Sequence, residues 1–282
     1  MDGTLRELIW AIAPEAIPRI KAAHAAAGTV KIGAVLPTPQ MGRRGALAVI
    51  PIHGIMVRRA SIFGELFGET SAEAIAGLVR AAAADPNIQT AVLWIDSPGG
   101  TTDSMVGLGD AIWQARQSGK LRIVAQVDGM GASAAYYAAS QADEIWANRM
   151  DMVGSIGVRG EMLDTSKLAE REGIEVLTFD SGWFKSAGAP GTPITDEMKA
   201  EFQRYVDVAY ADFLKVVERG RGMSAADLKP LADGRLFYAP EAKANGLIDG
   251  IRTMAETIQK FGGGRGASKP QTRLAAALTK FC

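Results

Sequence analysis

Short apolar segments alternate with amphipathic ones along the first half of the chain. Three segments, 46–52, 90–95 and 121–127, are apolar at nearly every position. Strands of this kind are typical of a parallel sheet that is buried on both faces. The intervening segments place apolar residues at helical spacing, one after a capping motif at 70–73 and one over about 103–117. This order predicts an α/β fold around a largely parallel, buried sheet.

The second half predicts shorter elements and one long helix. The expected strands are 144–147, 155–159, 174–179 and 235–238, and the expected short helices are 165–172, 225–228 and 240–245. The long helix begins at Thr195, where Asp196 and Glu197 suit the positive end of a helix dipole. We expect it to end near Gly220 or Gly222, since glycine commonly terminates helices.

The two ends of the chain lack this regularity. Residues 4–27 predict a short amphipathic helix that Pro14 and Pro18 interrupt, and residues 28–45, rich in glycine and proline, predict a linker. Residues 262–282 begin with three glycines and predict a flexible tail. The expected organisation is an arm and linker over 1–45, one folded domain over 46–261 and a tail over 262–282.

Composition narrows the classes of function. The 282 residues include 31 Lys and Arg and 31 Asp and Glu, so a net charge of zero gives no general attraction to nucleic acid or to an anionic membrane. The single cysteine, Cys282, excludes a disulfide within the chain, and two histidines are few for a Cys/His zinc site. No segment reaches the roughly 18 apolar residues of a membrane span, and the acidic, Pro-containing N-terminus is not a secretory signal. We expect a cytoplasmic protein with no membrane anchor, metal or nucleic-acid partner.

The candidate chemistry centres on Ser133. This serine follows the apolar segment 121–127 and the Gly-rich corner 128–132, and a run of small and aromatic residues suited to a helix comes next. A strand-to-helix corner exposes a hydroxyl, and the positive end of a helix stabilises a developing oxyanion. The alternative is that Ser133 only caps the helix, since serine is a preferred N-cap residue.

A serine nucleophile needs a base, and the sequence offers few. His24 and His53 are the only histidines, whereas Ser–Lys dyads perform the same role on other folds. A lysine accepts a proton only when neutral, and at a reference pKa of about 10.4 fewer than about 1 in 1,000 are neutral at pH 7. Burial among apolar groups favours the neutral form. Lys185 is the best candidate because it follows Trp183 and Phe184 in a segment without acidic residues; the alternative is an ordinary surface lysine.

Residues 96–100, DSPGG, supply a candidate oxyanion hole. They follow the apolar segment 90–95, and ligands in α/β proteins bind at the carboxyl ends of the strands. Glycines let the backbone approach a substrate closely. The alternative is a plain turn.

Together these segments resemble the Ser–Lys signal peptide peptidase A-like family, proteases of the Clp protease/crotonase-like fold with repeated β-β-α units. The resemblance covers about residues 46–251 and rests on six segments in the family's order: 96–100, 132–137, 142–145, 154–158, 181–188 and 234–249. It implies that 46–261 is a Ser–Lys peptidase domain that cleaves peptide bonds without a cofactor.

The resemblance also implies a role for each candidate residue. The implied roles are Ser133 as nucleophile, Lys185 as general base, Ser155 as the serine that orients the lysine, and Gly100 and Ala134 as the N–H donors of the oxyanion hole. Ala134 and Ala135 stand where the family often has two glycines, which narrows the space beside the scissile bond. Family members form rings in which the serine and the lysine can come from adjacent subunits, and the spacing in this chain allows either arrangement.

Within the family, the chain resembles the phage and prophage branch, because it carries an N-terminal arm and no membrane anchor is expected. Proteins of this branch are similar to the minor capsid protein C type of head-maturation protease. This implies an extended protein substrate, a homo-oligomeric ring, and capsid or portal partners in the cytoplasm or a phage procapsid. Two other functions stay open. One is a capsid-associated scaffold or assembly protein with little activity, which would dock through the Ala-rich arm and the basic tail. The other is a crotonase-like acyl-CoA enzyme on the same fold. That chemistry usually needs acidic groups in the pocket, and the Ser–Lys spacing does not call for it.

Overall fold

The computed structural model describes residues 10–12, 39–60, 64 and 68–262. The strands are β1 (Trp10–Ile12), β2 (Gly42–Arg44), β3 (Leu47–Val57), β4 (Glu69–Ser71), β5 (Thr90–Thr101), β6 (Arg122–Ala132), β7 (Glu144–Ala147), β8 (Met152–Gly154), β9 (Leu236–Tyr238) and β10 (Gly250–Ile251). The α-helices are α3 (Ala72–Ala84), α4 (Met105–Gln117), α5 (Ala134–Ala139), α6 (Ser166–Arg171), α7 (Asp196–Arg221), α8 (Ala225–Leu228), α9 (Ala239–Ala244) and α10 (Met254–Gly262). Two 3₁₀ turns, η3 (Thr102–Ser104) and η4 (Lys229–Leu231), complete the elements.

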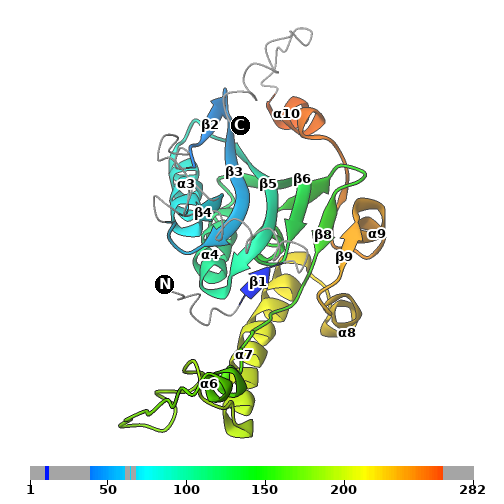
Figure 1. The fold of residues 1–282 in the computed structure, drawn as a ribbon. Helices are drawn as coiled ribbons and strands as arrows, with labels where there is room; N and C mark the ends of the chain where they lie inside the picture. The colour runs from blue at the N-terminus through cyan, green and yellow to red at the C-terminus, as the bar shows by residue number, and fades with distance from the viewer. Residues whose placement is uncertain (1–9, 13–38, 61–63, 65–67, 263–282) are drawn as a thin grey trace.

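One sheet with a parallel centre organises the molecule (Figure 1). Its main order is β10-β7-β6-β5-β3-β2, and the pairs β3–β5, β5–β6 and β6–β7 are all parallel. The edge strand β2 is antiparallel to β3. The units β3-β4-α3 and β7-β8-α6 follow a strand-strand-helix order. The predicted α/β class with a largely parallel sheet is confirmed.

The apolar strands are buried on both faces, as their composition predicts. In β5, Ala91, Leu93 and Ile95 join the main core cluster, which also contains the inward residues of α3, α4 and α5. The alternate residues Val92 and Trp94 join a smaller cluster beneath α10. Successive side chains of a strand point to opposite faces, so helices on both sides require a strand that is apolar throughout.

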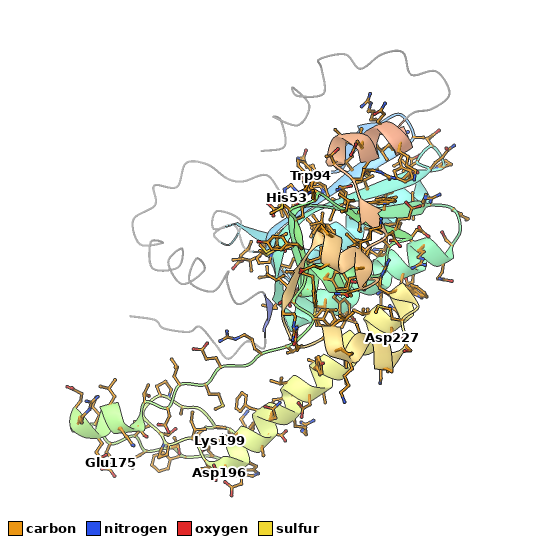
Figure 2. The ribbon with its side chains drawn as sticks, turned by 90° about the vertical axis from the view of Figure 1, so that its right-hand side faces the viewer. His53, Trp94, Glu175, Asp196, Lys199 and Asp227 are labelled. Carbon is orange, nitrogen blue, oxygen red and sulfur yellow. The ribbon has the colours of Figure 1, made fainter. Side chains whose placement is uncertain are left out.

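Helix α7 begins outside this body and ends within it. Its buried residues, Phe213, Val216, Val217 and Gly220, all lie in its second half. A 26-residue helix is about 39 Å long, and its first half carries residues 159–195, here called the arm, which include α6 (Figure 1). Figure 2 places Glu175 of the arm at the opposite end of the molecule from His53. No helix in the described part of the chain, α7 included, is long and apolar enough to cross a bilayer.

Two predicted strands of the second half are wrong. Residues 155–159 follow β8 without forming a strand, and residues 174–179 are an exposed loop of the arm. The apolar character of 174–179 indicated a strand, but a strand needs a partner for its backbone groups. No described strand lies in the arm beside it.

The predictions of a helix over 4–27 and of a linker over 28–45 are also wrong in part. Residues Trp10–Ile12, inside the expected helix 4–27, form β1. Residues Gly42–Arg44, inside the expected linker 28–45, form a hairpin with β3, and the positive φ of Gly45 allows its tight turn. Strands of three residues are too short to show an alternating pattern. The rest of the expected helix, linker residues 28–38 and tail residues 263–282 lie outside the described residues.

Candidate active site

Ser133 lies where β6 ends and α5 begins, as the sequence predicts. Its φ is 53°, a left-handed value that few residues other than glycine adopt. Its N–H donates to the Gly154 carbonyl at 2.8 Å, and its carbonyl accepts from the Tyr137 N–H at 2.8 Å. Such a conformation costs about 1–3 kcal/mol and persists only where its surroundings fix it, commonly at functional sites.

The Ser133 hydroxyl is completely buried, and its Oγ has no hydrogen-bond partner. Ser133 occupies the N-cap position of α5, but its side chain makes no capping hydrogen bond, so the alternative that the serine only caps the helix is wrong. The expectation of an exposed hydroxyl is also wrong, since no part of Ser133 is accessible to solvent. Burying a hydroxyl without a partner costs about 1–3 kcal/mol. Among the described side chains only two other buried polar atoms, on His53 and Arg252, share this condition.

Two tyrosines hold α5, and therefore the serine, in place. The Tyr136 hydroxyl donates to the Leu247 carbonyl at 2.8 Å. The Tyr137 hydroxyl donates to the Asp212 carboxylate of α7 at 2.9 Å. Burial raises the pKa of both tyrosines, and Asp212 raises the pKa of Tyr137 further. Both hydroxyls therefore stay protonated and keep donating at neutral pH.

The DSPGG segment extends β5 past the end of its pairing with β6. The two strands pair as far as Ser97 and Gly131. Ser133 comes two residues after Gly131, and Gly99 comes two residues after Ser97. Gly99 and Gly100 therefore lie just past the last paired residues, at the end of β5 where β6 turns into Ser133.

The position of Gly100 accepts no residue other than glycine. A Cβ on Gly100 would lie 1.7 Å from the Met56 carbonyl oxygen of β3. The Ser97 hydroxyl accepts from the Gly99 N–H at 3.1 Å and donates to the Gly54 carbonyl at 2.6 Å. Sequence reasoning missed this bracing role of Ser97. Its signal was a serine two residues before a glycine, a spacing typical of side-chain-closed turns.

Ser155 lies directly after β8, beside the Ser133 corner. The residue before it, Gly154, pairs with Ala132 at the end of β6. Ser155 is buried, and its N–H donates to the Arg235 carbonyl at 2.8 Å. Its φ is 49°, and in the described chain Ser133 and Ser155 are the only non-glycine residues with positive φ. The structure thus brings together two strained serines that the sequence had separated by 22 positions.

Lys185 is not brought to this corner within one chain. It is exposed on the arm, and the neighbouring Phe184 ring lies 5.9 Å from Phe202 in the first half of α7. The second half of α7 contacts α5 through Phe213, whose ring lies 5.4 Å from Tyr137. Phe202 and Phe213 are eleven positions apart in the helix, about 17 Å along its axis. The predicted dyad therefore does not form between residues of the same subunit in this conformation.

Residues 114–267, more than half of the chain, match Peptidase family S49. The chain belongs to this family. It is 32% identical over 63% of its length to a Methanocaldococcus jannaschii protein whose name describes a candidate protease, covering 56% of that protein. It is 26% identical over 77% of its length to the chloroplastic serine protease SPPA of Arabidopsis thaliana, covering 32% of that protein. It is 26% identical over 75% of its length to capsid assembly protease C of Escherichia phage lambda, covering 48% of that protein.

The S49 chain spans about half the length of curated relatives that it matches, 56% of one and 48% of another. Two solved structures are also similar. An enoyl-CoA hydratase/isomerase family member gives a TM-score of 0.46 at 18% identity, covering 86% of this chain and 75% of that one. A ClpP1 variant of Listeria monocytogenes gives a TM-score of 0.45 at 14% identity, covering 74% of this chain and 92% of that one.

His53, the histidine that the structure describes, is not placed as a base for Ser133. The His53 ring packs edge-on against Trp94, with centroids 4.5 Å apart (Figure 2). Trp94 belongs to the cluster beneath α10, whereas Ser133 leads into α5 on the opposite face of the sheet. His24 lies outside the described residues.

His53 makes the stability of the fold sensitive to mild acid. Burial lowers its pKa below 6.5, although Asp96 and Asp128 act in the opposite direction. The unfolded chain then binds a proton more readily than the folded chain, so the stability contributed by neutral His53 is complete above about pH 6.5 and decreases below it. We expect the urea unfolding midpoint to fall from about pH 7.5 to about pH 5.5. His53→Phe should make the urea unfolding midpoint less dependent on pH, because phenylalanine keeps a ring against Trp94 and does not titrate. If the variant shows the same pH dependence as the wild type, other groups cause it.

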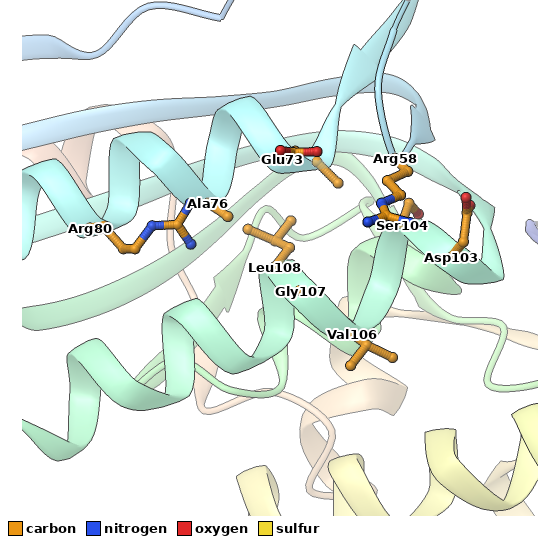
Figure 3. A pocket seen from close by; sticks show the side chains of 10 residues that line it. Arg58, Glu73, Ala76, Arg80, Asp103, Ser104, Val106, Gly107 and Leu108 are labelled. Carbon is orange, nitrogen blue, oxygen red and sulfur yellow. The ribbon is translucent and has the colours of Figure 1, made fainter.

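A separate pocket of about 420 Å³ lies between α3 and α4 (Figure 3). Its charged lining combines Arg58 and Arg80 with Glu73 and Asp103. Neither strained serine lines it, and its mixed charges favour no single class of ligand. The chemistry of the S49 chain is therefore argued from the Ser133 corner.

Proposed function

We propose that the chain is a serine endopeptidase with Ser133 as nucleophile and Lys185 as general base. The observation that carries this proposal is the Ser133 hydroxyl, which is buried without a partner at a strained corner of an S49 chain. An unsatisfied hydroxyl and a strained backbone each destabilise a fold. Their persistence at one residue is explained if the hydroxyl must be free to attack a substrate.

Lys185 reaches the serine of a neighbouring copy in this proposal. Twelve large apolar side chains are exposed in the described chain, and seven of them lie on the arm: Leu163, Leu168, Ile174, Val176, Leu177, Phe179 and Trp183. Exposed apolar side chains that gather in one part of a protein mark interaction surfaces. A second copy of the chain covers them if the arm of one subunit lies against the Ser133 corner of the next. A head-to-tail contact of this kind closes into a ring when the rotation between neighbouring subunits divides a full turn.

The chemistry then follows from the positions of the site residues. Neutral Lys185 takes the proton of the Ser133 hydroxyl as Oγ attacks the scissile carbonyl carbon, and Ser155 orients the lysine amine. The Gly100 and Ala134 N–H groups stabilise the oxyanion, which breaks down to an acyl-enzyme as the protonated lysine gives its proton to the leaving amine. Water, deprotonated by the same lysine, hydrolyses the ester and frees Ser133. No cofactor enters these steps.

The substrate in this proposal is an extended segment of a protein, with small or apolar side chains at the site. Buried Ala134 and Ala135 leave little room beside the nucleophile. The names of the relatives include a serine protease of the SPPA type and a phage capsid assembly protease. The proposed role is accordingly cleavage of signal-peptide-like segments or of capsid-associated proteins, in the cytoplasm or in a procapsid. A scaffold without activity has no use for a strained, unsatisfied serine, and we do not favour it.

Covalent labelling tests the nucleophile directly. A fluorophosphonate reacts with activated serine hydroxyls, and we expect one label per chain, located by peptide mass mapping at Ser133. Buried Ser140, at the other end of α5, is the internal control, because its hydroxyl donates to the Tyr137 carbonyl and is not activated. A label elsewhere, or no label on the assembled protein after prolonged reaction, would contradict the assignment.

A further inference from the structure

The N-terminal strand β1 lies on β5 at the proposed oxyanion hole. Its antiparallel register pairs Trp10 with Thr101, Ala11 with Gly100 and Ile12 with Gly99. These are the last three residues of β5, and one of them is the proposed oxyanion donor. The backbone edge that faces the reacting carbonyl in the proposed mechanism is therefore occupied by the chain itself.

Strand β1 fills the sheet position that β6 leaves empty. Strand β5 pairs with β6 as far as Ser97 and Gly131, and with β1 from Gly99 onward. On its other side the same part of β5 still pairs with β3, through Ile55 and Met56. One edge of β5 therefore opens where β6 turns into Ser133, and an extended peptide must use that edge to place its carbonyl near the serine.

The complete burial of Ser133 is a second, independent observation. A nucleophile with no exposed surface cannot be reached by a substrate in the arrangement that the structure shows. The occupied edge of β5 and the enclosed hydroxyl both describe a closed site.

We propose that β1 is an autoinhibitory pseudosubstrate strand, and that it must leave β5 before a peptide substrate can bind. This inference rests on the proposed function. Recognition of an added strand depends mainly on backbone hydrogen bonds, so one edge accepts both the N-terminal segment and a protein substrate of unrelated sequence. Three residues supply few such bonds, and each adds little net stability because the same groups can bond to water instead. A longer extended segment therefore competes effectively with β1.

A pair of prolines in β1 tests this proposal in the full-length, assembled protein. Successive N–H groups of a strand point to opposite edges, so Ala11→Pro combined with Ile12→Pro removes one donor facing β5 whatever the hydrogen-bonding phase. The matched control, Ala11→Val combined with Ile12→Val, keeps both N–H groups and suits a strand. The probe is a fluorescent synthetic peptide with the sequence of residues 5–17, and its binding is measured by anisotropy.

We expect the proline variant to bind the peptide at least about tenfold more tightly than the wild type, because an open state populated below about 10% weakens apparent affinity by that factor. The valine control should bind like the wild type. Fluorophosphonate labelling of Ser133 should accelerate by the same factor in the proline variant alone. Equal peptide affinity in all three chains would overturn the pseudosubstrate proposal.

The two readouts separate this proposal from the proposed function. Tighter peptide binding by the proline variant, with no labelling of any chain, would support β1 as the occupant of the edge and contradict the peptidase chemistry. Equal labelling and equal peptide binding in all chains would support the peptidase and contradict the inhibitory strand.

Discussion

Ser133→Ala is expected to abolish proteolysis of an unfolded protein while leaving the fold at least as stable as the wild type. Loss of an activated nucleophile lowers turnover by at least about a thousandfold. The Ser133 Oγ makes no hydrogen bond, so its removal breaks none and relieves a buried, unsatisfied polar atom. We expect a gain of about 1 kcal/mol in unfolding free energy, because a hydroxyl without a partner is unfavourable in the interior.

Ser140→Ala is the matched control for this experiment. Ser140 is equally buried at the other end of α5, but its hydroxyl donates to the Tyr137 carbonyl at 2.7 Å and accepts from the Gln141 amide at 2.7 Å. Its loss should cost about 1–3 kcal/mol of stability, since it leaves buried partners unsatisfied. Activity per folded molecule should be retained. Urea unfolding and a protease assay on the same preparations check both effects, and a Ser133→Ala chain that still cleaves would exclude Ser133 as the nucleophile.

Part of the fold around Ser133 could be predicted from the sequence. Residues 90–95 are apolar at nearly every position, so neither face of a strand there could face water. This pattern predicted a buried parallel strand, and β5 confirms the prediction. Secondary structure of this kind can be predicted because it depends on residues that are close together in the sequence. The Gly-rich residues 128–132 were expected to form the corner, but this prediction is wrong: they continue β6, and the chain turns only at Ser133.

Features that depend on distant pairing were not predictable in the same way. The strand character of Trp10–Ile12 comes from Gly99–Thr101, about ninety positions away. The loop at 174–179 has the apolar composition of a strand, but no partner strand lies beside it in the described arm. Strain at Ser155 likewise arises from a backbone path fixed by Arg235, far along the chain.

Activity is expected to return when two inactive variants, Ser133→Ala and Lys185→Ala, are assembled into the same ring. Lys185→Ala removes the proposed base, and we expect it to be as inactive as Ser133→Ala. If Lys185 serves the serine of an adjacent subunit, a co-expressed mixture contains interfaces that join an intact serine to an intact lysine. Random assembly of equal amounts produces such an interface at about one quarter of the positions in a ring.

Co-purified rings of Ser133→Ala and Lys185→Ala chains should therefore cleave an unfolded protein at about one quarter of the wild-type rate. The exposed placement of Lys185 on an arm carried beyond the sheet by the first half of α7 is the structural reason for expecting this exchange. Lys167→Ala, which changes another exposed lysine of the same arm within α6, should keep full activity and so separates loss of the base from damage to the arm. Assembly measured by light scattering must be equal in all samples. Mixed rings that assemble but remain inactive would place serine and lysine in one chain, and would require the arm to fold back onto the corner where Ser133 now lies closed.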